Sequence, residues 1–208
     1  EIPKGVTAKS VLENYINAIG GEKALKAVKT VYTISKANFQ GQDLELISKT
    51  SSDKKMLSEM KGMGMSLMKM VVNPKVAYMT QRGQRKDFEG DDLKEMQDVA
   101  YTFPELLLLS DSGVTLKGIE TINGSDAYSL TLGKRTMMYD AKTGLKVAES
   151  VEQEQGGQKL TQTTYFNDYK EVKGIKFPYN TVMNVGIELE LITQDVKINE
   201  GVTDADFE

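Results

Sequence analysis

The sequence predicts a mainly β protein of the α+β class, with an antiparallel sheet of about ten strands and helices on one side. Short apolar runs recur between turn residues at intervals of about 8–12 residues, which is typical of a curled sheet or a partial barrel. Helical periodicity occurs only near the N-terminus and once near the middle of the chain. No repeat, low-complexity tract or linker divides the chain, so residues 1–208 are expected to form a single domain.

The first element is predicted to be a helix that begins near Ala8 and ends at Gly20-Gly21. Thr7 can cap it by accepting a backbone hydrogen bond, and glycine ends helices because it adopts the left-handed conformation without a Cβ clash. A short second helix is expected over about residues 22–28. The apolar residues of the first helix recur along one stripe, which consists of Val11, Leu12, Tyr15, Ile16 and Ile19.

Strands are expected next over residues 30–40, from 44 onward, and over 55–61, 65–72 and 76–81, with a hairpin tip at Arg82-Gly83-Gln84. A helix capped by Asp91 or Asp92 should then interrupt the sheet. Pro104 is suited to open a further helical turn, because proline is favoured at the first helical position. The leucines that follow, residues 106–109, cannot alternate between two faces, so this turn is expected to be buried on most sides.

From Val114 onward the sequence predicts a meander of hairpins. Turns are expected at Asn123-Gly124 and Gly156-Gly157, because two-residue hairpin turns require positive φ angles. Pro178 indicates an edge strand or a strand end, since proline cannot donate to a ladder. The apolar alternation slips by one residue near Ile192-Thr193, which predicts a bulge. The tail is expected to dock through its two large apolar residues, Val202 and Phe207.

The composition excludes several classes of function. The chain has no Cys and no His, so it has no disulfide, thiolate nucleophile, zinc finger or usual Ser–His triad. We therefore predict no catalytic residue, no metal site, no cofactor and no enzymatic activity; a hydrolase that uses only carboxylates stays open as a third hypothesis. The net charge of −4 argues against a general affinity for nucleic acid or anionic membrane.

Seven of the 11 methionines lie between Met56 and Met79. If residues 62–70 form one strand, residues 63, 65 and 67 share a face, and residues 68 and 70 lie on the other face unless a bulge intervenes. Methionine is unbranched and polarizable, so methionine-rich surfaces suit apolar ligands of variable shape. The candidates for lining an apolar cavity are Met63, Met65, Leu67, Met68 and Met70. The alternative is a core strand with adaptable filler.

Two further groups are candidate site residues. Leu106, Leu107 and Leu108 would close the mouth of a half-open barrel, where apolar ligands commonly bind, or would simply complete the core. Arg82 and Arg85 flank the tip glycine and are candidates for contact with an anionic headgroup or a partner's carboxylate; the alternative role is solubility. The acidic clusters at 87–92 and 204–206 do not match a calcium loop and are expected to be solvated turns.

Four segments carry a resemblance to a known family: NYINAIGGEKAL at 14–25, GIETINGSDAY at 118–128, YDAKTGL at 139–145 and YKEVKGIKFPY at 169–179. Together they resemble the exported LolA/LolB-like proteins of bacteria, the outer-membrane lipoprotein-sorting type. The likeness is strongest to versions common in Bacteroidetes, some of which follow insulinase-like zinc peptidase domains. It runs across nearly the whole chain and consists of turns and strand ends rather than catalytic motifs.

The resemblance implies an open, strongly curved antiparallel sheet, or half-barrel, with helices capping its concave side. In lipoprotein carriers that concavity receives acyl chains. We therefore expect a non-catalytic protein of the periplasm or cell envelope, with no transmembrane segment, whose leader has been removed and which binds lipid or lipoprotein acyl chains. The alternative is an accessory or interaction module of an envelope zinc peptidase with no ligand of its own; zinc chemistry does not transfer, because the chain has no His.

Overall fold

The computed structural model describes residues 1–184 and 186–208. Across these residues, 13 strands hydrogen-bond in one sheet in the order β6-β5-β4-β3-β2-β1-β13-β12-β11-β10-β9-β8-β7. The mainly β, antiparallel class is thus confirmed, with 13 strands rather than about ten. β6 and β7 are free edges, so the strands do not close into a barrel. The predicted strong curvature of a half-barrel is not borne out.

The chain forms two compact units. Unit 1 comprises Glu1–Leu25 and Glu105–Glu190, and unit 2 comprises Lys26–Pro104 and Leu191–Glu208. Each unit is described by itself below, and the single domain expected over residues 1–208 stays a prediction.

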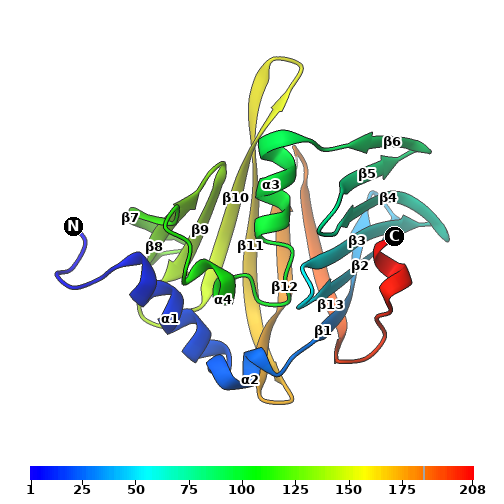
Figure 1. Ribbon diagram of the computed structural model, residues 1–208. Coiled ribbons are helices and arrows are strands. Elements are labelled where there is room, and N and C mark those ends of the chain that lie inside the picture. Colours follow the sequence, from blue (N-terminus) through cyan, green and yellow to red (C-terminus); the bar gives the residue numbers. More distant parts are fainter. Residues whose placement is uncertain (185) are drawn as a thin grey trace. The chain divides into compact units, whose positions relative to one another are not determined.

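Unit 1 has a long meander and two helices that lie side by side, α1 and α4 (Figure 1). α1 also packs against β12. The elements of this unit are α1 (Ala8–Ile19), α2 (Glu22–Lys26), which ends at the unit boundary, α4 (Glu105–Leu108), β7 (Thr115–Ile122), β8 (Ser125–Leu132), β9 (Arg135–Asp140), β10 (Lys146–Gln155), β11 (Gln158–Val172) and β12 (Ile175–Asn184).

α1 forms as its sequence predicts. The Thr7 hydroxyl accepts a hydrogen bond from the Ser10 backbone N–H, and the Ser10 hydroxyl accepts one from the Thr7 N–H. The helix ends at Gly20, whose φ of 151° no side chain would adopt readily. All five residues of the predicted apolar stripe are buried, so the helix is held in place by this one face.

Unit 2 contains the part of the strand order from β6 to β13, together with the α-helix α3. Its elements are β1 (Thr30–Phe39), β2 (Gln42–Ser51), β3 (Lys55–Gly62), β4 (Met65–Val72), β5 (Ala77–Gln81), β6 (Gln84–Asp87), α3 (Gly90–Asp98), the larger part of β13 (Glu188–Ile198) and the 3₁₀ helix η1 (Asp204–Phe207). The predicted cap of α3 is wrong, because the helix starts earlier than expected. Glu89 occupies the N-cap position, and Asp91 and Asp92 lie in the first turn, where a carboxylate favours the helix dipole.

The predicted hairpin turns are confirmed at Asn123-Gly124, with φ angles of 49° and 81°, and at Gly156-Gly157, with 60° and 79°. Arg82-Gly83 forms another, with 50° and 78°. Met63-Gly64 has the same geometry, with 53° and 75°. The assumption that residues 62–70 form one continuous strand is therefore wrong: the chain reverses at Met63, and β3 ends before it.

Two irregularities concern the ladders themselves. The register of β1 and β13 shifts opposite Thr193 and Asp195, which confirms the predicted bulge within two residues. The prediction for Pro178 is wrong, because β12 lies between β11 and β13 in the strand order. Pro178 pairs with Tyr169 of β11, next to Asp168, which has a positive φ of 53°.

The tail closes one face of unit 2. Phe207 packs with Leu57, Val71 and Tyr78, and Val202 lies against the same cluster, as predicted. None of the helices formed by the described residues has the length and apolarity needed to cross a bilayer.

Candidate functional site

Five methionines of unit 2 share one face of strands β3, β4 and β5. Cross-strand partners in a sheet project to the same side, and Met60 pairs with Met68 while Met70 pairs with Met79. Met56 joins this side through its pairing with Val72. We call the surface formed by Met56, Met60, Met68, Met70 and Met79 the methionine face.

A bulge decides which side chains of β4 reach this face. Met60 pairs with Met68, whereas the next residue, Lys61, pairs with Ser66, so Leu67 is the extra residue. A Cβ built on Gly62 would lie 2.9 Å from Leu67 Cδ1 and 3.0 Å from Leu44 Cδ2. The missing side chain of Gly62 therefore leaves room for Leu67 on the methionine face. The sequence predicts Met68 and Met70 on the other face from Leu67 unless a bulge intervenes. The bulge is present, so Leu67, Met68 and Met70 lie on one face.

The methionine face is only partly covered. Met56 and Met70 pack against a buried cluster of Val72, Ala77 and Ala100, together with Leu93 and Met96 of the segment around α3. All five methionines of the face stay half-buried. Thioether side chains with several rotatable bonds can rearrange in such a setting, so the face is apolar and deformable.

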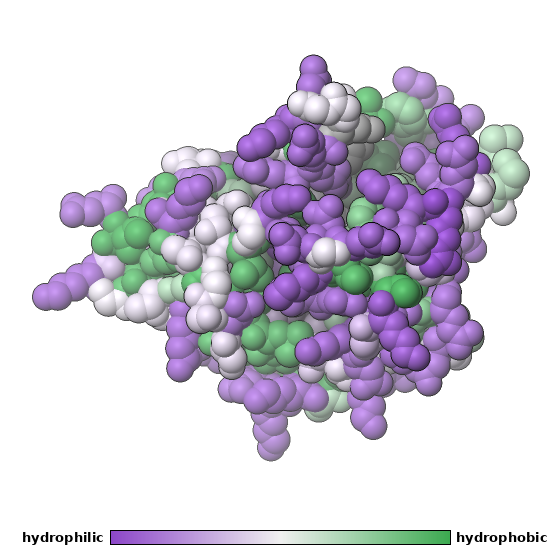
Figure 2. Space-filling view, turned by 45° about the horizontal axis from the view of Figure 1, so that its top comes forward, coloured by the Kyte–Doolittle hydropathy of each residue, from purple (hydrophilic) through white to green (hydrophobic). Residues whose placement is uncertain are grey.

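At the β3–β4 turn the apolar side chains are exposed to solvent. Met63 is 78% exposed, Met65 62% and Leu67 40%. β5 pairs with β4 from Met68 onward, so residues 65–67 overhang β5. On the side of the molecule seen in Figure 2, hydrophobic residues lie in separate patches between hydrophilic ones. By the exposure of its side chains, the β3–β4 hairpin tip is an apolar surface patch.

The two candidate arginines lie on β6 and its turn but have different surroundings. Arg82 is an exposed residue of the turn itself. Arg85 stacks 3.8 Å above the Tyr78 ring and forms an ion pair of 2.7 Å with Asp87. The hydrogen bond between these two groups raises the pKa of the Arg85 guanidinium and lowers the pKa of the Asp87 carboxyl. Of the two, Arg82 is the side chain better placed to meet an external anion.

The leucines of α4 belong to unit 1. Leu108 is buried, as expected, whereas Leu106, Leu107 and Leu109 are half-buried. The expectation of burial on most sides therefore holds for Leu108 alone. The candidate residues are thus brought together only within unit 2, where Met65, Leu67, Met68 and Met70 follow one another along β4.

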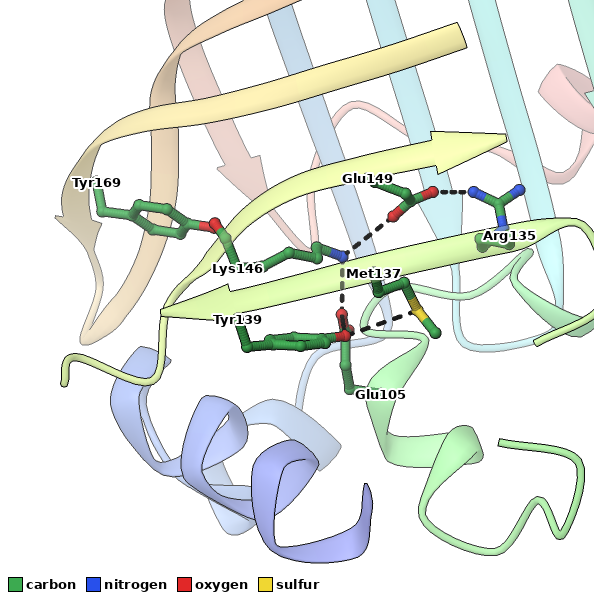
Figure 3. A network of polar contacts seen from close by, with 7 residues as sticks. All are labelled: Glu105, Arg135, Met137, Tyr139, Lys146, Glu149 and Tyr169. Carbon is green, nitrogen blue, oxygen red and sulfur yellow. Dashed lines mark hydrogen bonds and ion pairs between the residues drawn. The ribbon is translucent and has the colours of Figure 1, made fainter. Parts of the chain in front are cut away.

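α4 also positions a charged network that the sequence did not predict (Figure 3). Glu105 is 1% exposed. It accepts hydrogen bonds from Lys146 Nζ at 2.7 Å and from Tyr139 Oη at 3.0 Å. Lys146 also lies 3.6 Å from Glu149, which pairs in turn with Arg135. Two carboxylates are thereby matched by two cations, and α4 is tied to β9 and β10.

Three tyrosines surround this network. The ring of Tyr15 meets that of Tyr139 edge-on at 5.3 Å, and Tyr169 donates to the Lys146 carbonyl at 2.7 Å. Burial raises the pKa of all three phenols, and the charge of Glu105 adds to this effect. They therefore stay protonated at ordinary pH and act as donors rather than as bases or nucleophiles. Each charge of the network is thus partnered inside it.

Sequence reasoning missed Glu105 because a carboxylate at the start of a helix usually faces solvent, where it favours the dipole. The signal present was its position in front of four leucines, inside a segment predicted to be buried. Within the described parts of the chain, no group of three or more acidic residues is arranged to hold a metal ion.

The comparisons with known proteins concern the fold. No protein-family model and no curated protein matches the sequence. The structure is similar to that of a LolA superfamily protein from Nitrosomonas europaea, with a TM-score of 0.58, 12% identity and 98% of each chain covered. It is also similar to a DUF1329 family protein from Desulfovibrio piger, with a TM-score of 0.56, 13% identity and 97% of each chain covered.

The chain has a LolA-like fold. At identities of 12% and 13%, this likeness concerns architecture and carries over no residue role. The sequence resemblance to LolA/LolB-like proteins is thereby supported at the level of fold.

Proposed function

We propose that this protein is a non-catalytic binding protein of the periplasm or cell envelope that holds lipid or lipoprotein acyl chains. The methionine face is the observation that carries the proposal. It presents five adaptable apolar side chains that stay half-buried, on a fold shared with a LolA superfamily protein. An acyl chain laid along this face would remove methylene groups from water, each contributing about 0.8 kcal/mol.

In this proposal Leu67, Met68 and Met70 contact the chain, and Met63 and Met65 extend the apolar surface toward the hairpin tip. Leu106, Leu107 and Leu108 of α4 are a separate candidate apolar contact within unit 1. Arg82 would meet an anionic headgroup, and Arg85 would do so only after giving up Asp87. No group in the proposal performs a reaction, so the protein binds without catalysis.

The test is extraction of the purified protein with organic solvent to identify bound lipid, followed by displacement of an apolar fluorophore by fatty acids. The variant Met60→Gln/Met68→Gln places two amides on the methionine face and should weaken fatty-acid binding about tenfold or more. Ile47→Gln is the matched control, because Ile47 is half-buried on the opposite face of β2. Equal binding by both variants, or no displacement from the unmodified protein, would reject the proposal and favour the accessory module of an envelope peptidase.

A further inference from the structure

We infer that the tip of the β3–β4 hairpin docks onto the surface of a lipid bilayer by inserting Met63 and Met65 among the headgroups and upper acyl chains. This contact differs from the acyl-chain binding proposed above, since it uses the exposed end of the apolar surface and requires no chain on the methionine face.

The first argument is exposure. Large apolar side chains are normally scattered singly over a protein surface. Here three of them follow within five residues, and two are more than half exposed. The turn holds them there, because Met63 and Gly64 adopt positive φ and reverse the chain within two residues. β3 and β4 pair up to Gly62 and Met65, so the tip is held at the end of this ladder.

The second argument is the chemistry of the neighbouring turns. The register places the β1–β2, β3–β4 and β5–β6 turns at the same end of the strands of unit 2. The turn residues themselves are uncharged in the first turn, with Gln40, Gly41 and Gln42, and so are Gln81, Gly83 and Gln84 around the third. The nearest carboxylate, Asp43, accepts a hydrogen bond from Asn38. Arg82 is the one charged side chain of these three turns. A bilayer interface disfavours carboxylates and accepts amides, and arginine meets the lipid phosphate.

The third argument is area. A stable protein–protein interface buries about 800 Å² on each partner, which a two-residue turn does not supply. Shallow insertion into a bilayer needs only a few apolar side chains and gains with each methylene buried. The net charge of −4 does not draw the whole molecule to anionic lipid. The bound surface is therefore zwitterionic lipid, and insertion rather than net charge drives the binding.

The test is flotation with phosphatidylcholine vesicles. The variant Met63→Asn/Met65→Thr keeps the turn, because asparagine tolerates the positive φ and threonine suits a strand. It should lower the vesicle partition coefficient about tenfold or more. Val76→Thr is the matched control, an exposed apolar residue in the β4–β5 turn at the other end of the same strands; it should change partitioning by less than about twofold. Arg82→Gln should weaken binding a few-fold.

A second measurement reports on the tip directly. The chain has no Cys, so Met63→Cys or Val76→Cys can carry a single environment-sensitive fluorophore. The label at position 63 should shift to shorter wavelength when vesicles are added, and the label at position 76 should not. The inference is overturned if the label at 63 does not respond, if the tip variant floats like the unmodified protein, or if the tip mediates self-association without vesicle binding. Flotation of the Met60→Gln/Met68→Gln variant, whose tip is unchanged, separates this outcome from failure of the proposed function: it should lose fatty-acid binding and still float with the vesicles.

Discussion

Glu105 illustrates how one residue is made tolerable in a β-rich interior. It is a charged side chain that is 1% exposed, with Lys146 and Tyr139 as its donors. Lys146 has further contacts, because its ammonium lies 5.6 Å from the Tyr15 ring and 5.5 Å from the Phe166 ring. A buried ion pair adds little net stability, but removing one partner leaves an uncompensated charge. Replacing Lys146 and replacing Glu105 should therefore lower the free energy of unfolding by different amounts.

Lys146→Met should lower the free energy of unfolding by about 3–5 kcal/mol, because the buried Glu105 carboxyl would lose its cationic partner and keep one hydroxyl donor. Glu105→Gln should lower it by about 1–3 kcal/mol, since Lys146 retains Glu149. Urea unfolding of both single variants and of the double variant Lys146→Met/Glu105→Gln measures the coupling. Losses that simply add up would contradict the assignment of the two residues to one network.

Among the elements, the C-terminal tail shows how a short segment becomes ordered. η1 has four residues, too few to be stable alone. It is held by Phe207 in the cluster of unit 2 and by ion pairs from Lys49 to Asp206 at 2.7 Å and from Lys55 to Asp204 at 3.2 Å. Asn73 and Tyr78 donate to the last two backbone carbonyls. The exposed pair at Asp204 contributes about 0–1 kcal/mol, whereas Lys49 and Asp206 are both partly buried. Burial of the Phe207 ring is the largest contribution, because loss of a buried aromatic side chain costs about 3–5 kcal/mol.

Phe207→Ala should therefore destabilise the protein by about 3–5 kcal/mol through the cavity it leaves. Lys55→Gln is the control for the polar contacts of the tail and should cost less than about 1 kcal/mol, since Asp204 is largely exposed. Thermal unfolding of the two variants compares the contributions. A Phe207→Ala variant as stable as Lys55→Gln would show that the tail docks by charge rather than by packing.

For the whole molecule, composition governs the response to pH. The chain has no His and no Cys, the side chains whose ordinary pKa values lie closest to neutrality. Its carboxylates set the acid limit. Burial acts to raise the pKa of Asp206, but hydrogen bonds from Lys49 and the Thr203 backbone outweigh it, so this pKa lies below the usual value. The pKa of Asp140 is lowered in the same way, with burial opposed by hydrogen bonds from the Thr143 and Lys142 backbone.

A carboxyl whose pKa is lowered by folding contributes stability above its unfolded pKa and loses it as the pH falls through the folded value. The free energy of unfolding should thus stay constant within about 1 kcal/mol from about pH 6 to 8 and fall below about pH 4. Urea unfolding across this range is the measurement, and Asp206→Asn should lose part of the acid-dependent drop. A change in the free energy of unfolding centred near neutral pH would contradict the prediction that carboxylates set the pH dependence.

Local sequence determined much of this protein. The cap and stripe of α1, the glycine-containing hairpin turns and the docking of Phe207 all followed from it. The cap and the turns depend on residues close together in the chain: a side chain that caps and a position that needs positive φ. The docking of Phe207 was predictable because a large apolar residue in a polar tail has to be buried, although its partners are far away in sequence. The absence of His and Cys likewise limited the available chemistry and the response to pH, because composition alone decides which side chains can titrate near neutrality without a shifted pKa.

Tertiary structure alone decided the rest. The bulge that places Leu67 on the methionine face, the interior position of Pro178 and the burial of Glu105 all depend on partners far away in sequence. Strand order and register are set by pairing energies between distant segments, and a slip of one residue reverses every side chain of a strand. The same residues were therefore visible as candidates, but which of them share a face was fixed only when the strands paired.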